Sequence, residues 1–253
     1  MRNLAPLARR EIASAFFSPL SYVVAAVFLV LTGAFFPYLA DNASSTSDLV
    51  DQIWNQPADW AAHQFLSLVQ TLLMFAAPLL TIRVLSEEHR SGSIEALLTA
   101  PVTDAEVVVA KWAGVYAFFL FMIALTGAHM AFVFHYGSPD AWRVAAHYLG
   151  VALLGAFFLA IGVFASALTR NAIVAGGVAL LLIMAHSLTG LVDYYFGGRL
   201  GQFFKQMAPY SLLAQMEQGM VTLHQGVFFI SMTAFWLFMA TRALESRKWR
   251  ASP

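Results

Sequence analysis

The sequence predicts an all-α integral membrane protein with six transmembrane helices. Of its 253 residues, 60% are hydrophobic and only 11% are charged, and the mean hydropathy is +0.69. A soluble domain usually carries roughly a quarter charged residues, so this composition excludes an ordinary soluble fold. Helices are expected because lipid leaves backbone polar groups without water, and the apolar runs are too long and unbroken for barrel strands.

A short amphipathic helix is predicted before the first span. Apolar residues recur there at helical spacing, with Arg9, Arg10 and Glu11 between them. This pattern is typical of a helix that lies on the membrane surface, and Ser18-Pro19 marks the point where the chain turns into the membrane. A frayed basic terminus is the alternative.

Six apolar runs are long enough to cross a hydrocarbon core of about 30 Å, which takes roughly 20 helical residues. The chain shows no internal repeat and no second soluble domain, so it is predicted to form a single transmembrane domain, 1–253. The polar residues 41–64 are expected to form a loop. The predicted spans cover approximately residues 19–40, 65–82, 112–134, 144–168, 172–192 and 221–241.

The placement of Lys and Arg predicts the orientation, because loops rich in these residues stay in the cytoplasm. With six spans, both termini lie on the same side, and that side carries 11 of the 14 Lys and Arg residues. The other side carries only Arg143, Arg199 and Lys205. The N- and C-termini and the segment between the second and third spans are therefore predicted to be cytoplasmic.

The segment between the second and third spans, SEEHRSGSIEALLTAP at Ser86–Pro101, has the pattern of a short amphipathic helix over about residues 92–101. Gly92 or Ser93 can cap its start, and Glu95 lies in the first turn, where a negative charge suits the helix dipole. Its apolar positions recur at i, i+3, i+4 and i+7 and form one stripe. This stripe consists of Ile94, Leu97, Leu98 and Pro101.

A helix of about two turns is not stable alone, so the stripe must be buried against another surface. That surface is the bilayer, the protein's own spans or a separate cytoplasmic protein. The charged residues 87–90 suit the polar rim of an interface with an apolar centre. After the stripe, Thr103 and Glu106 have the spacing of a capping box that starts the third span.

Two further features follow along the chain. In the fourth span, small residues recur at every fourth position (Ala152, Ala156, Ala160), with Gly162 and Ser166 as a second pair, which favours close packing within the chain over dimerisation. Between the fifth and sixth spans, Pro209 opens a moderately amphipathic stretch. We predict an external helical or re-entrant segment there, with an ordinary external loop as the alternative.

Several classes of protein are excluded or disfavoured by composition. The zero net charge does not suggest a nucleic-acid partner, and the lack of Cys rules out disulfides, thiolate metal sites and cysteine nucleophiles. None of the three Lys residues follows a Gly, so the chain has no phosphate loop for ATP. No HExxH or GxSxG motif is present, and we expect no catalytic residue and no metal site.

The stretch SEEHRSGSIEALLTAPVTDAEVVVAKW resembles the signature of type-2 ABC exporter permeases. The similarity is greatest to the short six-span permeases associated with gliding motility, and the permease of nitrous-oxide-reductase maturation is a more distant relative. Residues 16–36 resemble the first span of this family and its lead-in. Residues 208–249 resemble its last external segment and final span.

This resemblance implies a non-catalytic permease subunit of an ABC exporter, in the bacterial inner (plasma) membrane and surrounded by lipid. The short cytoplasmic helix would be the coupling helix, which docks in a groove of a separate ABC ATPase subunit. Two ATPases would pair with two permeases, the second being another copy or a related chain. ATP and Mg²⁺ would be bound by the ATPase, with no cofactor in this chain, and an external auxiliary protein is compatible with the scheme. The implied ATPase-coupling residues are Glu87, Glu88, Arg90, Gly92, Ile94, Glu95, Leu97, Leu98 and Pro101.

Two other functions stay open at this point. His129 and His186 lie inside spans at similar depth, as the axial ligands of a haem would, so a membrane-anchored haem or quinone redox subunit is one alternative. The other is a mechanical scaffold that an ATPase drives without a transported substrate. The aromatic and apolar spans are compatible with lipids, lipid-linked molecules or hydrophobic peptides as substrates and do not choose among them.

Overall fold

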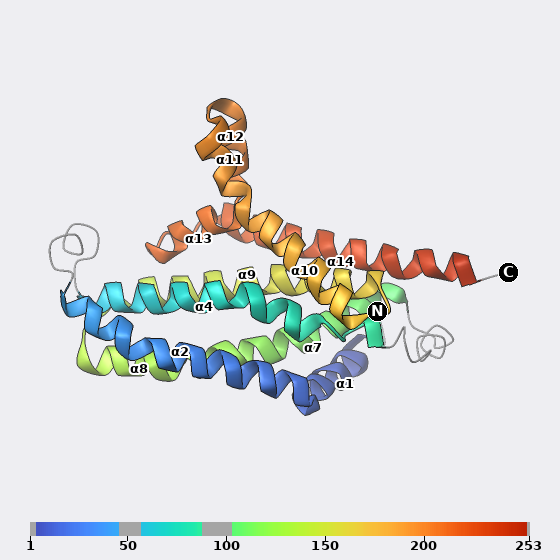
Figure 1. The fold of residues 1–253 in the computed structure, drawn as a ribbon, viewed down its shortest axis with the longest axis horizontal. Helices are drawn as coiled ribbons and strands as arrows, with labels where there is room; N and C mark the ends of the chain where they lie inside the picture. The colour runs from blue at the N-terminus through green and yellow to red at the C-terminus, as the bar shows by residue number, and fades with distance from the viewer. Residues whose placement is uncertain (1–3, 46–56, 88–102, 252–253) are drawn as a thin grey trace.

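The computed structural model describes residues 4–45, 57–87 and 103–251, and every regular element in these ranges is helical (Figure 1). The all-α prediction is confirmed. In chain order the elements are α1 Leu4–Phe17, α2 Pro19–Ser45, α4 Pro57–Thr81, α7 Asp104–Leu125, α8 Gly127–Tyr136, α9 Ala141–Leu168, α10 Ala172–Ser187, the 3-10 helix η1 Leu188–Gly190, α11 Leu191–Phe196, α12 Gly198–Gln206, α13 Pro209–Glu217 and α14 Leu223–Ala251.

Six stretches of the described chain are long and apolar enough to cross a membrane, as predicted. They are Pro19–Leu39, Pro57–Thr81, Asp104–Tyr136, Ala141–Leu168, Ala172–Gly190 and Leu223–Ser246. The main difference concerns the expected loop at residues 41–64, because α2 continues to Ser45 and α4 already begins at Pro57. Polar residues are tolerated in this part of α4 because they find partners across the bundle: Asp59 accepts a hydrogen bond from the Asp140 backbone N–H at 2.6 Å.

The third span is two helices, with a break at Thr126 between α7 and α8. The buried Thr126 hydroxyl bonds back to the Ile123 carbonyl and lies 3.0 Å from the Tyr148 hydroxyl of α9. The contact with Tyr148 holds this break against α9.

The α9 helix lies at the centre of the bundle and packs against α4, α7, α10, α13 and α14. Its most apolar window is 78% buried, whereas the corresponding windows of α2, α10 and α14 are only 17–28% buried and expose their apolar side chains. Small residues on α9 allow this crowding. A Cβ on Gly155 would lie 2.1 Å from the Phe119 ring, and one on Gly162 would lie 2.0 Å from the Thr81 hydroxyl.

The predicted N-terminal helix is present as α1, and it packs along α7. The Lys111 ammonium of α7 lies 3.2 Å from the Glu11 carboxylate, with both side chains largely buried. Gly114 permits the close approach, because a Cβ there would lie 2.8 Å from the Glu11 backbone. The first helix is therefore tied to the third span as well as leading into α2.

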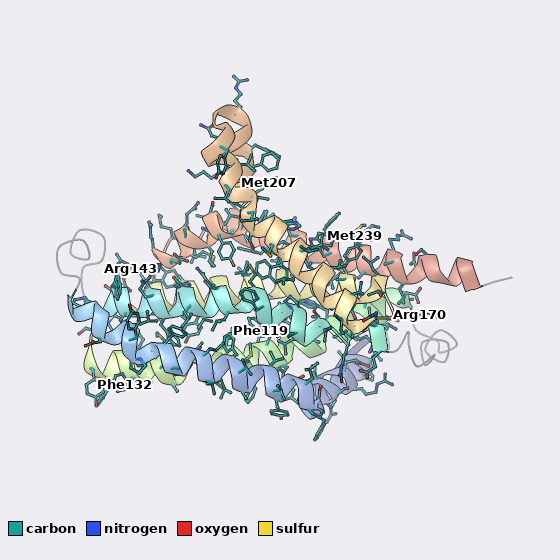
Figure 2. All side chains as sticks on the ribbon, viewed as in Figure 1. Phe119, Phe132, Arg143, Arg170, Met207 and Met239 are labelled. Atoms are coloured by element: carbon teal, nitrogen blue, oxygen red, sulfur yellow. The ribbon has the colours of Figure 1, made fainter. Side chains whose placement is uncertain are left out.

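The bundle has two ends, which Arg143 and Arg170 mark on opposite sides of Figure 2. We call the end where α4 finishes and α7 begins the insert end, since residues 88–102 lie between those helices. The opposite end, where α4 and α9 begin, is the far end. The predicted helical segment between the last two spans is present as α11, α12 and α13, and α11 and α12 project away from the bundle (Figure 1). The turn between them uses Gly197 and Gly198 at φ of 53° and 63°, a region that glycine adopts without strain.

Candidate functional site

Of the predicted ATPase-coupling residues, only Glu87 lies within the described part of the chain. The other eight, Glu88, Arg90, Gly92, Ile94, Glu95, Leu97, Leu98 and Pro101, lie in residues 88–102, outside the described residues. What the structure shows is how the chain is held immediately before and after this segment.

The attachment before the segment is buried in the bundle. After α4 ends at Thr81, the backbone N–H groups of Leu85 and Ser86 both donate to the Ser166 hydroxyl of α9, at 2.9 and 3.0 Å. All three residues are almost completely buried. Leu85 also belongs to an apolar cluster from four parts of the chain, which consists of Leu85, Val108, Val163, Ala167, Ala240 and Leu244.

The attachment after the segment is the capping box that the spacing predicted. The Thr103 hydroxyl accepts from the Glu106 N–H at 3.3 Å, and the Glu106 carboxylate accepts from the Thr103 N–H at 3.0 Å. These bonds satisfy two backbone donors that a helix start otherwise leaves unpaired. The first turn of α7 is thereby fixed where the chain re-enters the bundle.

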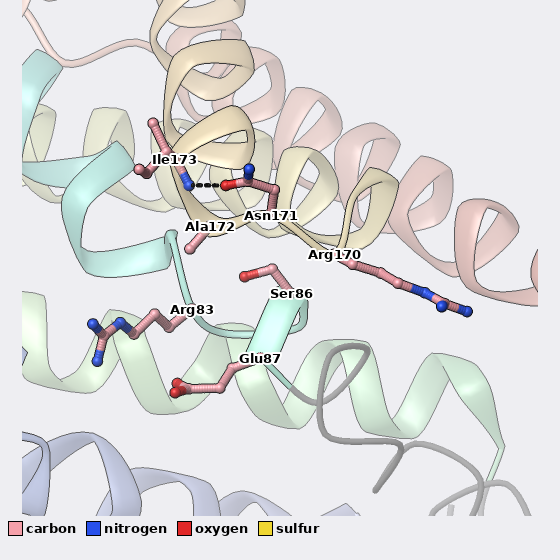
Figure 3. Close-up of a pocket in the computed structure, with 7 residues that line it drawn as sticks. All are labelled: Arg83, Ser86, Glu87, Arg170, Asn171, Ala172 and Ile173. Atoms are coloured by element: carbon pink, nitrogen blue, oxygen red, sulfur yellow. Dashed lines mark hydrogen bonds between the residues drawn. The ribbon is translucent and has the colours of Figure 1, made fainter.

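A cavity of about 440 Å³ adjoins the end of the first attachment (Figure 3). Arg83, Ser86 and Glu87 line it from the α4 side, and Arg170, Asn171, Ala172 and Ile173 line it where α9 passes into α10. The Asn171 side chain caps α10 by accepting from the Ile173 N–H at 3.0 Å. Glu87 also lines a second depression, together with Glu11 of α1 and Lys111 of α7. Because it lines both hollows, Glu87 lies between α1 and the start of α10.

The small residues of the fourth span act within the chain, as the sequence favoured. Gly162 accommodates Thr81, and Ser166 holds the backbone of Leu85 and Ser86. The carbonyl groups of Ala156 and Ala152 accept from the Trp112 indole at 3.0 Å and the Tyr116 hydroxyl at 3.3 Å.

Removing the hydroxyl of Ser166 tests the first attachment. Ser166→Ala leaves two buried N–H groups without their acceptor, and an unsatisfied buried donor costs about 1–3 kcal/mol. We expect a lower unfolding temperature in detergent and faster hydrogen exchange at Leu85 and Ser86. Ser231→Ala is the control, because its exposed hydroxyl bonds only to the Val227 carbonyl of its own helix. Equal effects of the two substitutions would contradict this role for Ser166.

The second attachment has its own test. We expect Thr103→Ala to destabilise the start of α7 by about 1 kcal/mol, the usual cost of losing such a cap. Hydrogen exchange at residues 104–107 measures this change. Thr103→Ser keeps a hydroxyl acceptor and should retain most of the protection; if it exchanges as fast as the alanine variant, the cap is not what holds this turn.

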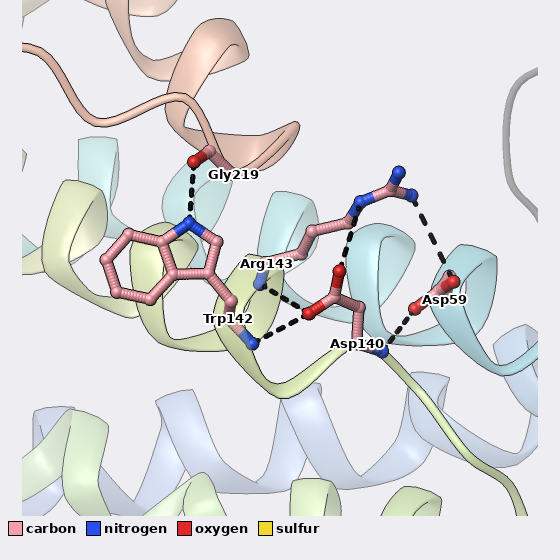
Figure 4. Close-up of polar contacts among 5 residues, drawn as sticks. All are labelled: Asp59, Asp140, Trp142, Arg143 and Gly219. Carbon is pink, nitrogen blue, oxygen red and sulfur yellow. Dashed lines mark hydrogen bonds and ion pairs between the residues drawn. The ribbon is translucent and has the colours of Figure 1, made fainter.

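A second polar site lies at the far end, where α4, α9 and α13 meet. Arg143 lies 4.0 Å from the Asp59 carboxylate and 3.7 Å from that of Asp140, which also caps α9 (Figure 4). The Trp142 indole donates to the Gly219 carbonyl at 2.8 Å and so joins α9 to the chain that follows α13. Burial raises the pKa of Glu217 in α13, although a hydrogen bond from Gln70 acts in the opposite direction.

Sequence reasoning missed this far-end site. Its signal was helical spacing: Asp59, His63 and Gln70 are separated by four and seven residues and so share a face of α4, and Arg143 and His147 are i, i+4 on α9. Glu217 could not be added to them because its position depends on how α13 folds back against the bundle.

The two histidines considered as haem ligands lie in different surroundings. His129 stacks on Phe65 and meets Phe36 edge-on, whereas His186 meets Phe157 and Trp236. Among the described ring contacts, the two histidines share no partner.

Six apolar spans, one of which (α9) lies at the centre of the bundle, define a multi-pass helical membrane protein. The chain belongs to the ABC-2 transporter family, since the family described as ABC-2 family transporter protein matches residues 6–238. The resemblance to type-2 ABC permeases is thus confirmed.

Two curated relatives are similar to part of the chain. Each is named probable multidrug ABC transporter permease YbhS, one from Escherichia coli strain K12 and the other from Escherichia coli O157:H7. Each is 29% identical over 144 residues, which is 55% of this chain and 38% of the relative. The matched region thus spans well under two thirds of these relatives.

Proposed function

We propose that this chain is the non-catalytic permease subunit of an ATP-driven exporter, and that a separate ATPase subunit docks on residues 87–101. The observation that carries the proposal is the double attachment of this segment, through Ser166 before it and Thr103 after it. Membership of the ABC-2 family and the lack of a phosphate loop support a division of labour in which ATP and Mg²⁺ bind to the partner.

The attachments offer a route for mechanical coupling. Force on the segment reaches α9 through Ser166 and α7 through the capping box, and α7 is tied to α1 through Lys111 and Glu11. Coupling between sites needs packed elements that move together, and these contacts supply them. In this mechanism, ATP-driven closure of two ATPases moves the insert ends of two permeases, and the gap between the permeases opens at the far end.

The exposed surfaces support a proposal for the nature of the cargo. The spans expose large apolar side chains, such as Ile173, Leu181 and Ile230, which suit lipid or a hydrophobic molecule. The relatives carry the name of multidrug permeases. We therefore propose a hydrophobic or amphipathic substrate and location in a bacterial inner membrane, with the insert end cytoplasmic.

The proposal is tested by purifying the tagged chain with bound partners from its native membrane and placing the eluate in lipid nanodiscs. We expect an ABC ATPase in near-equal amount and Mg²⁺-dependent ATP hydrolysis, with a cross-link from the segment to that ATPase. Retrieval without an ATPase, or an ATPase that cross-links only elsewhere, would count against it. An absorption spectrum of the same sample tests the redox alternative, which requires a Soret band.

A further inference from the structure

Four polar side chains from three helices meet at the far end, and we call them the Glu217 cluster: His63 and Gln70 of α4, His147 of α9, and Glu217 of α13. The two Glu217 carboxylate oxygens lie 3.6 Å from His63 Nδ1 and 3.6 Å from His147 Nε2. The Gln70 amide donates to Glu217 at 3.1 Å, and the two histidine rings are 5.8 Å apart. A carboxylate thus lies between two imidazoles at a helix junction, close enough for electrostatic interaction with both, and His147 Nε2 also lies 3.4 Å from the Gln70 side-chain oxygen.

The cluster is removed from water. The side chains of His147 and Glu217 are only 2% and 11% exposed, and that of His63 is 20% exposed. Net charge in such a place is costly, so buried ionisable groups are stable when their charges cancel. Groups this close also titrate as a unit rather than singly.

The charge of the cluster depends on how many protons the carboxyl and the two imidazoles share. With one proton, the net charge is zero, whether that proton is on the carboxyl or on one imidazole. With none the cluster carries −1, and with two it carries +1. One shared proton is therefore the state in which α13 is bound best, and both gain and loss of a proton weaken the junction.

The other charged or titratable side chains around α13 do not cancel these charges. Arg143 and Asp59 line the same small cavity as His63, His147 and Glu217, but they pair with each other at 4.0 Å and so add no net charge there. Asp140, which lies 3.7 Å from Arg143, is half exposed. Lys205 and His224 line a different cavity with Gln215, and His186 lies among aromatic rings. Burial raises the pKa of Glu217, which agrees with a carboxyl that shares a proton more readily than usual.

We propose that the Glu217 cluster is a proton-binding site that holds α13 against α4 and α9, so that the far end of the protein responds to pH. With one proton bound, α13 is held; with none or two, it is released. Release would also strain the bond from the Trp142 indole to the Gly219 carbonyl, only two residues beyond Glu217. This proposal does not depend on the identity of the ATPase partner or on the proposed transport function.

The test measures the distance between α9 and α13 as a function of pH. The natural chain has no Cys, so Ala145→Cys and Gln218→Cys, both at exposed positions, can be spin-labelled without other changes. Pulsed electron–electron double resonance in nanodiscs then measures the fraction of molecules in which the two spin labels lie close together, over about pH 4 to pH 10. We expect this population to be greatest at an intermediate pH and to fall on both sides, by up to roughly tenfold per pH unit for one proton.

Two variants separate the two sides of this profile. Glu217→Gln has no carboxylate, so no negative charge can form; the alkaline decline should disappear and the acid decline should persist. The double variant His63→Gln/His147→Gln cannot become positive, so it should lose the acid decline and keep the alkaline one. His224→Gln is the control and should keep both, because His224 lies outside the cluster.

A wild-type profile that is flat with pH overturns the proposal without recourse to any variant. So does a profile whose two declines both persist in Glu217→Gln and in the double histidine variant. Both declines lost in His224→Gln would assign the response to the cavity of Lys205 and Gln215 instead, and would equally overturn it.

Discussion

Replacing Gly162 with valine is expected to destabilise the protein by about 3 kcal/mol or more, because overpacking alone costs roughly 1–3 kcal/mol and this site has no room to relax. A Cβ at this position would lie 2.0 Å from the Thr81 hydroxyl and 2.7 Å from its Cβ. Thr81 is fully buried, and its hydroxyl already donates to the Ala77 carbonyl at 2.8 Å. The end of α4 must therefore move away from α9.

Gly177→Val provides a matched control for this effect. Gly177 also lies inside a helix, α10, but a Cβ added there would have no neighbouring atom within 4 Å. Both substitutions change helix propensity equally, so the difference between them isolates the contact with Thr81. Thermal unfolding in detergent measures it, with hydrogen exchange at Leu85 and Ser86 as a local readout. Similar losses of stability in the two variants would contradict the packing argument.

The double substitution Leu97→Glu/Leu98→Glu is expected to weaken ATPase binding strongly while leaving membrane insertion intact. Both residues belong to the apolar stripe that we propose enters a groove of the ATPase. Burying an unpaired charge in an apolar groove costs several kcal/mol, and each 1.4 kcal/mol is about tenfold in affinity. We expect affinity for the ATPase to fall roughly 100-fold or more, as measured by titrating the ATPase onto the permease in nanodiscs.

The control for this prediction places the same two charges on the opposite face of the same segment. Ala96 and Thr99 lie about 150° from the centre of the stripe if residues 92–101 are helical. Ala96→Glu/Thr99→Glu should therefore bind the ATPase within about threefold of wild type, a difference of well under 1 kcal/mol. Equal loss in both double variants would point to general disruption of the segment, and normal binding by Leu97→Glu/Leu98→Glu would remove the docking proposal.

Much of the fold could be predicted from local patterns. Apolar runs located the six spans, helical spacing located α1, and the pair Thr103 and Glu106 identified the start of α7. Such features depend on residues close together in the chain, and a membrane enforces them because unsatisfied backbone groups are too costly in lipid. The cytoplasmic location of the insert end stays a prediction from charge asymmetry.

The helix boundaries near polar residues were harder to predict. The polar stretch before the second span was expected to be a loop, yet α4 includes Asp59 and His63. The mean hydropathy of a window of residues is lowered by these polar side chains, so they are placed outside the predicted span. In the folded chain, Asp59 accepts a hydrogen bond from the start of α9 and His63 faces Glu217. These contacts offset the cost of burying the two polar side chains, and they come from residues too far away in the sequence to fall within one hydropathy window.

By itself, the sequence determined that this chain is a helical membrane protein, where its six candidate spans lie, and that it resembles the type-2 ABC permeases, because apolar length and a local motif are properties of contiguous residues. Only the tertiary structure decided that Ser166 holds the chain before the insert and that Glu217 lies between His63 and His147. Those contacts join residues about 80 and 150 positions apart, and α9 brings them together through the small side chains that let its neighbours approach.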